Sequence, residues 1–243
     1  MLDNDQIAAA SRTLLQHWRA GTRLPNLDPS QRPRDRAEGY AIQAEIERTS
    51  AARLFGWKIA ATSEAGQKHI NVDGPMAGNE MRVAEPEFAF RMKQDLPPRS
   101  SPYGVAEVLD AVGTLRPAIE IPDSRFADFA SVGAAQIIAD NACAHLFVLG
   151  TATAADWRAL DLVEARAVIN LRGRQYVGYG KNVLGNPRVA LAWLVNELRQ
   201  LGLTLKQGEV VTTGTCHPPL PIQAGDVVAA DFGALGKVSV AFE

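Results

Sequence analysis

Cysteine, histidine and long apolar runs are all scarce in this sequence. It has 243 residues but only 2 cysteines, Cys143 and Cys216, and 4 histidines. Two cysteines supply neither a disulfide framework nor a zinc site by themselves, so the cytoplasm is the expected compartment. No apolar run is long enough to cross a bilayer, and the N-terminus lacks the basic and apolar regions of a secretory signal. We therefore expect no membrane partner.

A basic excess is also missing, because the net charge is −2. Nucleic-acid-binding domains normally carry a clear positive excess, so a nucleic-acid partner is not expected. The sequence does have apolar residues in quantity: 47% are hydrophobic, which is enough for a sizeable core. The length fits one large domain, or a main domain with a smaller N-terminal region.

Helical patterns fill the first fifty residues. Apolar residues recur at helical spacing over 3–21, which ends in glycine, and again over 35–54. We predict a small helical N-terminal region over 1–54 and a catalytic β-roll domain over 55–243. Two later helices are expected, one over about 133–144 and one that begins at Asn186–Pro187 and ends at Gly202.

Short β-rich runs dominate the chain after residue 55, separated by Gly, Pro, Asn and Asp. One pair is expected to form a hairpin that turns at Gly173. The pattern predicts an α+β, β-rich fold, with a rolled or barrel-like mixed sheet and a few helices packed outside it. The predicted strands are GWKIAAT, EFAFRM, PAIEIPDS, HLFVLGT, EARAVINLRG, RQYVGYGK, EVVTTGT, DVVAADF and GKVSVAFE.

Three glutamates stand out against this pattern. Glu85 and Glu87 flank Pro86 at the start of a strand, and alternation points both side chains the same way. Glu120 lies between two isoleucines, where an inward carboxylate needs compensation. Three carboxylates without a nearby His or Cys would suit Mg²⁺ or Mn²⁺. The alternative is a solvated edge strand, marked by its proline.

Several segments, in order along the chain, resemble the fumarylacetoacetate hydrolase superfamily. The resemblance runs from about residue 37 to the end and is greatest to the branch of 2-keto-4-pentenoate hydratase and 4-oxalocrotonate decarboxylase. It implies a rolled β-sheet barrel and a metal site at Glu85, Glu87 and Glu120. The segments are EGYAIQ, GWKIAATS, VDGPMAG, AEPEFAF, PAIEIPDSRF, IADNA, FVLG, GYGKNVLGNPRVALAWLVNEL, LKQGEVVTTGT and IQAGDVVAADFGALGKVSVAF.

The resemblance also implies roles for two residues that pattern alone leaves ambiguous. Lys58 lies in an apolar strand and could simply extend its amine into water, but the family directs the matching lysine into the active site. Asp73 precedes a glycine, as in many turns, but the family has an acidic residue here on a loop over the site. We interpret both as candidate catalytic residues.

Three further residues are candidate substrate ligands. The family has a hydroxyl-rich stretch near the substrate carboxylate, which corresponds to Thr213 and Thr215 here, although a plain strand end is the alternative. Arg125 could bind a carboxylate bidentately, or it could orient Glu120 or pair with Asp123. A thiol nucleophile at Cys216 is not expected, because the adjacent His217 would face the other side of the strand.

The function implied by the resemblance is a divalent-metal-dependent hydratase. It would add water to a 2-hydroxy-2,4-dienoate, or its 2-oxo tautomer, in the meta-cleavage breakdown of aromatic compounds. A 4-oxalocrotonate-type decarboxylase, an acylpyruvate C–C hydrolase and a non-catalytic partner subunit remain alternatives, because the same metal site serves each chemistry. The expected partners are the small 2-oxo acid, further copies of the chain in a homo-oligomer, and a hydratase–decarboxylase complex.

Overall fold

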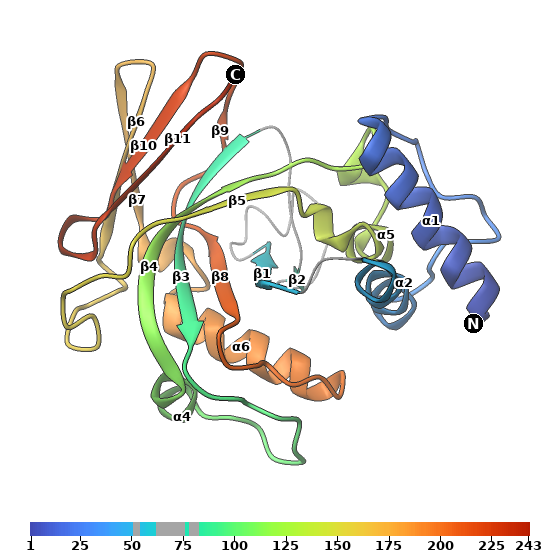
Figure 1. The fold of residues 1–243 in the computed structure, drawn as a ribbon, viewed down its shortest axis with the longest axis horizontal. Helices are drawn as coiled ribbons and strands as arrows, with labels where there is room; N and C mark the ends of the chain where they lie inside the picture. Colours follow the sequence, from blue (N-terminus) through green and yellow to red (C-terminus); the bar gives the residue numbers. More distant parts are fainter. Residues whose placement is uncertain (51–53, 62–75, 78–82) are drawn as a thin grey trace.

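The computed structural model describes residues 1–50, 54–61, 76–77 and 83–243. Helices α1 (Asn4–Ala20) and α2 (Arg36–Thr49) lie side by side at the N-terminal end (Figure 1). Asp3 caps α1 in a capping box. Gly21 ends the helix in the left-handed conformation, at the glycine where the sequence predicts its end. The proposed division of the chain at residue 54 stays a prediction.

The later helices differ in how well their sequences predict them. Helix α6 (Pro187–Gln200) begins as expected, with the Asn186 side chain accepting a hydrogen bond from the N–H of Arg188. The helix predicted over 133–144 is shorter: α5 spans Ala134–Ala139, and a separate 3-10 turn, Asn141–Cys143, follows. Asn141, Ala142 and Cys143 have positive φ angles, which end the α-helix. Helix α4 (Val105–Asp110) is an element that the sequence pattern did not predict.

The main sheet carries the strands on which the three glutamates lie. In the described part of the chain its order is β2-β1-β8-β3-β4-β5, and β9 pairs with β3. Strand β1 runs parallel to β8, whereas the other pairs are antiparallel, so the sheet is mixed. Its members are β1 (Gly56–Ala60), β2 (Met76–Ala77), β3 (Val83–Met92), β4 (Val112–Ile121), β5 (Leu146–Leu149), β8 (Val210–Thr215) and β9 (Leu220–Pro221).

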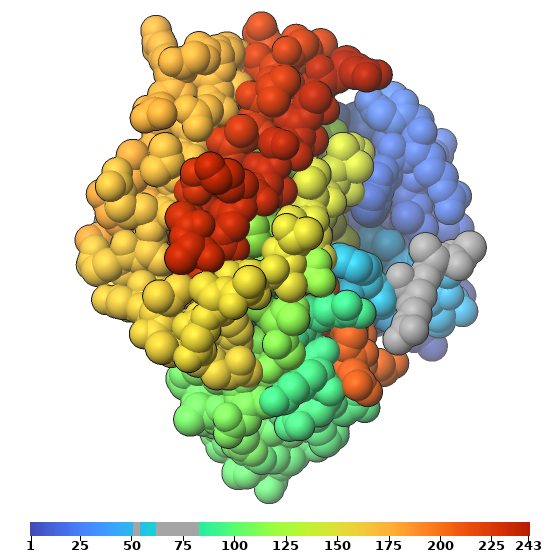
Figure 2. Space-filling model, turned by 60° about the vertical axis from the view of Figure 1, so that its left-hand side comes forward, coloured from blue at the N-terminus to red at the C-terminus, as the bar shows by residue number. Residues whose placement is uncertain are grey.

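A second antiparallel sheet packs against the first, in the order β11-β10-β6-β7. The turn between β6 and β7 includes Gly173 at φ +72°, which confirms the predicted hairpin. Figure 2 shows this sheet (orange and red) and the segment after β5 (yellow) covering one face, with the N-terminal helices at its edge. Its strands are β6 (Arg166–Leu171), β7 (Arg174–Tyr179), β10 (Val227–Asp231) and β11 (Lys237–Ala241).

The hydrophobic core lies mainly on one face of the main sheet, whereas the face that carries the glutamates has a small apolar cluster of Ala89, Ala118 and Val210. Phe88 contacts Phe232, which directly follows β10, edge to face with ring centroids 5.4 Å apart, and Phe90 contacts Trp157 with ring centroids 5.6 Å apart. Together the two sheets form a curled half-barrel with helices around it (Figure 1), which confirms the predicted α+β fold. None of the helices in the described ranges is long and apolar enough to span a membrane.

Candidate metal and substrate site

Strands β3 and β4 bring the three predicted glutamates together. Their register sets Glu85 directly opposite Glu120, and Glu87 lies two residues further along the same face. One carboxylate oxygen from each residue lies within 4.8 Å of the others. Glu87 and Glu120 are 0% and 2% exposed, so the solvated edge-strand alternative does not hold. We call Glu85, Glu87 and Glu120 the carboxylate cluster.

Burial raises the pKa of all three carboxyl groups, and repulsion from neighbouring carboxylates adds to the rise at Glu87 and Glu120. The pKa of Glu87 rises to about 7, because burial and then the Glu85 carboxylate disfavour its charged form. Burial likewise raises the pKa of Glu85, and it raises that of Glu120 well above its usual value. The Lys58 ammonium acts in the opposite direction at each group. The cluster therefore needs positive charge before all three groups can ionise near neutral pH.

The two oxygens of Glu87 differ in their hydrogen bonding. Its Oε2 accepts hydrogen bonds from the Thr212 hydroxyl and, at 2.8 Å, from the Gly214 N–H. Its Oε1 is buried and has no hydrogen-bond partner within the described residues. Because buried carboxylate oxygens are normally satisfied, this atom is available to a ligand. Three converging carboxylates make an all-oxygen set of the kind that divalent cations such as Mg²⁺ prefer, so the residues present fit such an ion.

Lys58 reaches the carboxylate cluster from the neighbouring part of the sheet. The parallel pairing of β1 with β8 sets Lys58 beside Thr212. Its Nζ lies 3.1 Å from Glu120 Oε2, and its side chain is only 11% exposed. The amine is thus directed at the cluster, as the resemblance implies, and does not extend into bulk water.

The threonines of β8 are arranged differently from the prediction. Thr212, which the sequence reasoning passed over, faces Glu87, whereas the Thr213 hydroxyl donates to the Phe88 carbonyl at 3.1 Å. The Thr215 hydroxyl donates to the His217 carbonyl at 2.5 Å. An irregularity in the β3–β8 register, next to Gly214 at φ +99°, shifts the alternation by one residue.

Arg125 lies away from the carboxylate cluster, in a buried ion pair with Asp140. Its Nε and Nη2 donate to Asp140, and its Nη1 donates to the carbonyls of Asp123 and Ala144 at 2.8 Å. All three guanidinium nitrogens therefore donate hydrogen bonds within the protein, and the side chain is buried. The prediction that Arg125 is a substrate ligand is wrong, and the structural alternative holds with Asp140, not Asp123, as the partner.

The other candidates contribute less to the site. Asp73 lies outside the described residues, so its role stays a prediction. Cys216 is fully buried, and burial raises the pKa of its thiol well above the usual value, which agrees with excluding it as a nucleophile.

A hollow of about 790 Å³ opens from the cluster toward the N-terminal helices. Lys58, Glu120 and Thr212 form its inner end, and apolar side chains from β5, α2 and the segments next to β1 and α6 form most of the remainder. Sequence periodicity gives no sign of this space, because it depends on how α1 and α2 pack over the sheet. Its apolar wall includes Phe55, Leu146, Phe147, Leu201, Leu203 and Val210.

Comparisons with known proteins show the family to which the chain belongs. The family described as fumarylacetoacetate (FAA) hydrolase, C-terminal, matches residues 40–242. A 2-keto-4-pentenoate hydratase from Burkholderia vietnamiensis is 31% identical, over 100% of this chain and 99% of that protein. A 2-hydroxyhexa-2,4-dienoate hydratase from Comamonas testosteroni is also 31% identical, with the same two coverages.

Among solved structures, the 4-oxalocrotonate decarboxylase from Pseudomonas putida G7, complexed with magnesium and adipate, has a similar fold. The TM-score is 0.89 at 23% identity, over 100% of this chain and 99% of that one. At this identity the likeness establishes the shared fold.

Proposed function

Because the chain belongs to the fumarylacetoacetate hydrolase family, we propose that it is a divalent-metal-dependent hydratase of 2-hydroxy-2,4-dienoates. The carboxylate cluster carries this proposal, because Glu87 and Glu120 are buried and Glu87 Oε1 has no hydrogen-bond partner among the described residues. The hydratases from Burkholderia vietnamiensis and Comamonas testosteroni, which resemble the chain over its whole length, support the choice of reaction.

Glu85, Glu87 and Glu120 would hold the cation, with Mg²⁺ or Mn²⁺ favoured by the oxygen ligands. The magnesium in the decarboxylase from Pseudomonas putida G7 supports this choice. When bound, the ion would supply positive charge that polarises the 2-oxo acid end of the substrate. Thr212 and the Gly214 N–H would hold Glu87 in orientation through its Oε2, which leaves Oε1 for the ion.

Lys58 would hold and move the proton, with Asp73 as a further candidate. In the first step a proton leaves the 2-hydroxyl group and another is delivered to C5, so that the dienol becomes a 2-oxo-3-enoate. In the second step a water hydroxyl adds to C4 and a proton to C3, which gives the 4-hydroxy-2-oxo acid. Thr215, the last residue of β8, is the candidate contact for the substrate carboxylate. The setting would be the breakdown of aromatic compounds, with the enzyme acting as a cytoplasmic homo-oligomer.

The test is a spectroscopic assay of the purified protein. After chelation and readdition of Mg²⁺, we expect the protein to consume the dienol absorbance of 2-hydroxypenta-2,4-dienoate. Glu87→Gln should lower kcat/KM at least about a hundredfold and weaken Mn²⁺ binding in a titration, since it removes one of three charged ligands. Absorbance loss no faster than in the chelated control would exclude the hydratase.

The products separate the hydratase from its alternatives. Hydration gives one 4-hydroxy-2-oxo acid, whereas release of carbon dioxide from an oxalocrotonate indicates the decarboxylase. Release of pyruvate from an acylpyruvate indicates the C–C hydrolase. Absence of turnover with every one of these substrates, together with unchanged Mn²⁺ affinity in Glu87→Gln, would favour a non-catalytic partner subunit.

A further inference from the structure

The hollow next to the carboxylate cluster is much larger than a five-carbon acid needs. Its volume of about 790 Å³ lies in the upper part of the range for small-molecule sites. The inner end is the proposed catalytic site itself, since Lys58, Glu120 and Thr212 belong to both. A substrate held at the cluster by its acid end would therefore extend into this space.

The walls next to the cluster are apolar. In the β4–β5 register Phe147 lies directly opposite Glu120. The Phe147 ring lies 6.4 Å from that of Phe55, whose backbone carbonyl accepts a hydrogen bond from the N–H of Val210. Phe55 is 59% exposed and Leu203 is 40% exposed, so this apolar surface lies unburied beside the cluster. It would gain stabilisation from an apolar group that covers it.

Helix α2 leaves room for such a group. Ala37, Ala41 and Ala44 line the hollow from this helix, at the i, i+4 and i+7 spacing that puts them on one face. A single methyl at each position keeps the space between helix and sheet open.

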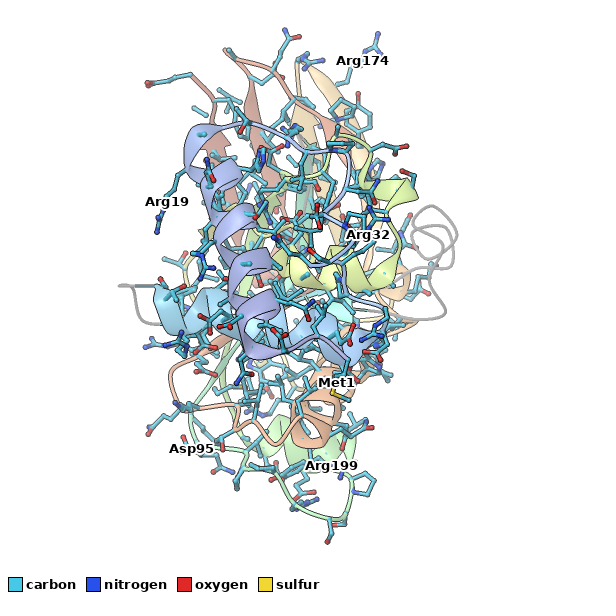
Figure 3. The ribbon with its side chains drawn as sticks, turned by 90° about the vertical axis from the view of Figure 1, so that its right-hand side faces the viewer. Met1, Arg19, Arg32, Asp95, Arg174 and Arg199 are labelled. Atoms are coloured by element: carbon cyan, nitrogen blue, oxygen red, sulfur yellow. The ribbon has the colours of Figure 1, made fainter. Side chains whose placement is uncertain are left out.

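Positive charge is scarce in the same space. Among the described residues that line the hollow, the basic ones are Arg19, Lys58 and His145. Lys58 is paired with Glu120, and Arg19 lines the hollow from α1 as an exposed residue whose side chain extends outward from the helix (Figure 3). Burial lowers the pKa of His145, so its ring favours the neutral form. Among the described lining residues Lys58 is the buried cation, so a second carboxylate on the substrate would lose hydration at the apolar walls without a further buried cation beside it.

We infer that the hollow binds the far end of the substrate, and that the preferred substrates are 2-hydroxy-2,4-dienoates with an apolar substituent on C5. This inference rests on the proposed hydratase function and names its substrate class. Dicarboxylic analogues, which carry a carboxylate at that end, are excluded by the same walls.

The experiment measures kcat/KM with Mg²⁺ for dienoates whose C5 substituent is hydrogen, methyl, propyl, pentyl or carboxylate. We expect kcat/KM to rise about fourfold for each of the first few added methylenes. The carboxylate analogue should fall about a hundredfold below an apolar one of similar length. Equal kcat/KM for all apolar substituents, or preference for the carboxylate, would overturn the inference while leaving the hydratase function intact.

Variants test whether the C5 substituent of the substrate, its tail, lies in the hollow. Ala41→Phe should fill the hollow and reduce kcat/KM for the pentyl substrate at least about tenfold more than for the unsubstituted one. The control is Ala20→Phe at the exposed end of α1, outside the hollow, which should leave the ratio unchanged. Phe55→Arg should raise kcat/KM for the carboxylate analogue several-fold. Equal ratios in the two phenylalanine variants would overturn the inference.

Two further measurements separate this inference from the hydratase proposal and from an interface. Calorimetry with Mn²⁺ and saturated 2-oxo acids of increasing length needs no turnover. Tighter binding of longer acids supports the tail site even if no dienoate is hydrated, and equal binding contradicts it. If Phe55→Ser lowers the mass of the protein in solution and leaves the tail-length dependence unchanged, the surface is an interface between copies and the inference fails.

Discussion

Two groups of buried charge in this molecule are built in opposite ways. Asp140, 0% exposed, faces the Arg125 guanidinium, and hydrogen bonds from Ser124 and Arg125 reach both of its oxygens. The carboxylate cluster brings three acids together beside Lys58 and leaves Glu87 Oε1 without a hydrogen bond in the described part of the chain. The first group is electrostatically complete within the protein, whereas the second still needs a cation.

The contrast shows how a structural charge differs from a functional one. Burial raises the pKa of Asp140 and of the three glutamates alike, so a shifted pKa does not distinguish them. What differs is the partner: a fixed guanidinium at Asp140, and like charges at the cluster. Removal of a charge should therefore have opposite effects on stability in the two places.

The largest expected effect comes from breaking the complete pair. Arg125→Met leaves the Asp140 carboxylate buried without its cation and should lower the free energy of unfolding by about 3 to 5 kcal/mol. Glu87→Gln removes repulsion in the metal-free protein, so it should leave the free energy of unfolding unchanged or raise it by about 1 kcal/mol. Urea denaturation in the presence of a chelator measures both changes.

A matched control for Arg125→Met is Arg23→Met, which breaks the half-exposed pair with Asp123. Its cost should stay below about 1 kcal/mol. If Arg125→Met fails to accumulate as folded protein while Arg23→Met does, loss of the buried ion pair is still shown to cost more stability than loss of the exposed one. A loss of stability in Glu87→Gln as large as that in Arg125→Met would mean that the two groups do not differ.

A smaller effect is expected from pH. The pKa of Glu87 is about 7 in the folded protein against an ordinary 4.5, so the native state binds more protons than the unfolded chain between these values. The free energy of unfolding of the metal-free protein should therefore fall, by roughly 1 to 3 kcal/mol, as the pH rises through this window. Glu85 and Glu120 shift in the same direction and add to the slope. Urea denaturation at several pH values with a chelator measures it.

Saturating Mg²⁺ should flatten or reverse the slope of the free energy of unfolding against pH, because the ion favours the ionised carboxylates. In Glu87→Gln the metal-free slope should also shrink. Glu38 does not interfere, since its pKa is lowered to about 2 and its stabilising contribution is lost only as the pH falls below the ordinary value of 4.5. An unchanged slope with and without Mg²⁺ would argue against a metal at the cluster.

The sequence predicts the cluster better than its surroundings, for a physical reason. Alternation along β3 puts Glu85 and Glu87 on one face whatever the partner strand, and the isoleucines around Glu120 fix its face in the same way. Helix α6 is equally predictable, because its cap and first residues are local signals. The distances between strands depend on register, which no local pattern specifies.

The errors arise where a residue's partner comes from elsewhere in the chain. Arg125 has the chemistry to bind a carboxylate, but its partner Asp140 lies on the segment after α5. The threonine error has another origin: simple alternation pairs Thr213 with Thr215, but the register irregularity next to Gly214 turns Thr212 toward Glu87. A glycine inside a strand is itself a signal of such an irregularity.

The register irregularity between β3 and β8 leads to the smallest expected effect on metal binding and stability, which a pair of neighbouring variants would measure. Thr212→Val removes the hydroxyl bound to Glu87 Oε2 and should weaken Mn²⁺ binding about three- to tenfold, because the ligand loses part of its orientation. Thr213→Val removes a hydrogen bond to the Phe88 carbonyl and should lower the free energy of unfolding by about 1 kcal/mol with unchanged Mn²⁺ affinity. Titration with Mn²⁺ and urea denaturation on both variants separate the two roles.

Thr212→Ser, which keeps the hydroxyl, should restore the Mn²⁺ affinity. A loss of Mn²⁺ affinity confined to Thr213→Val would mean that β8 keeps its simple alternation and that Thr213 supports the cluster.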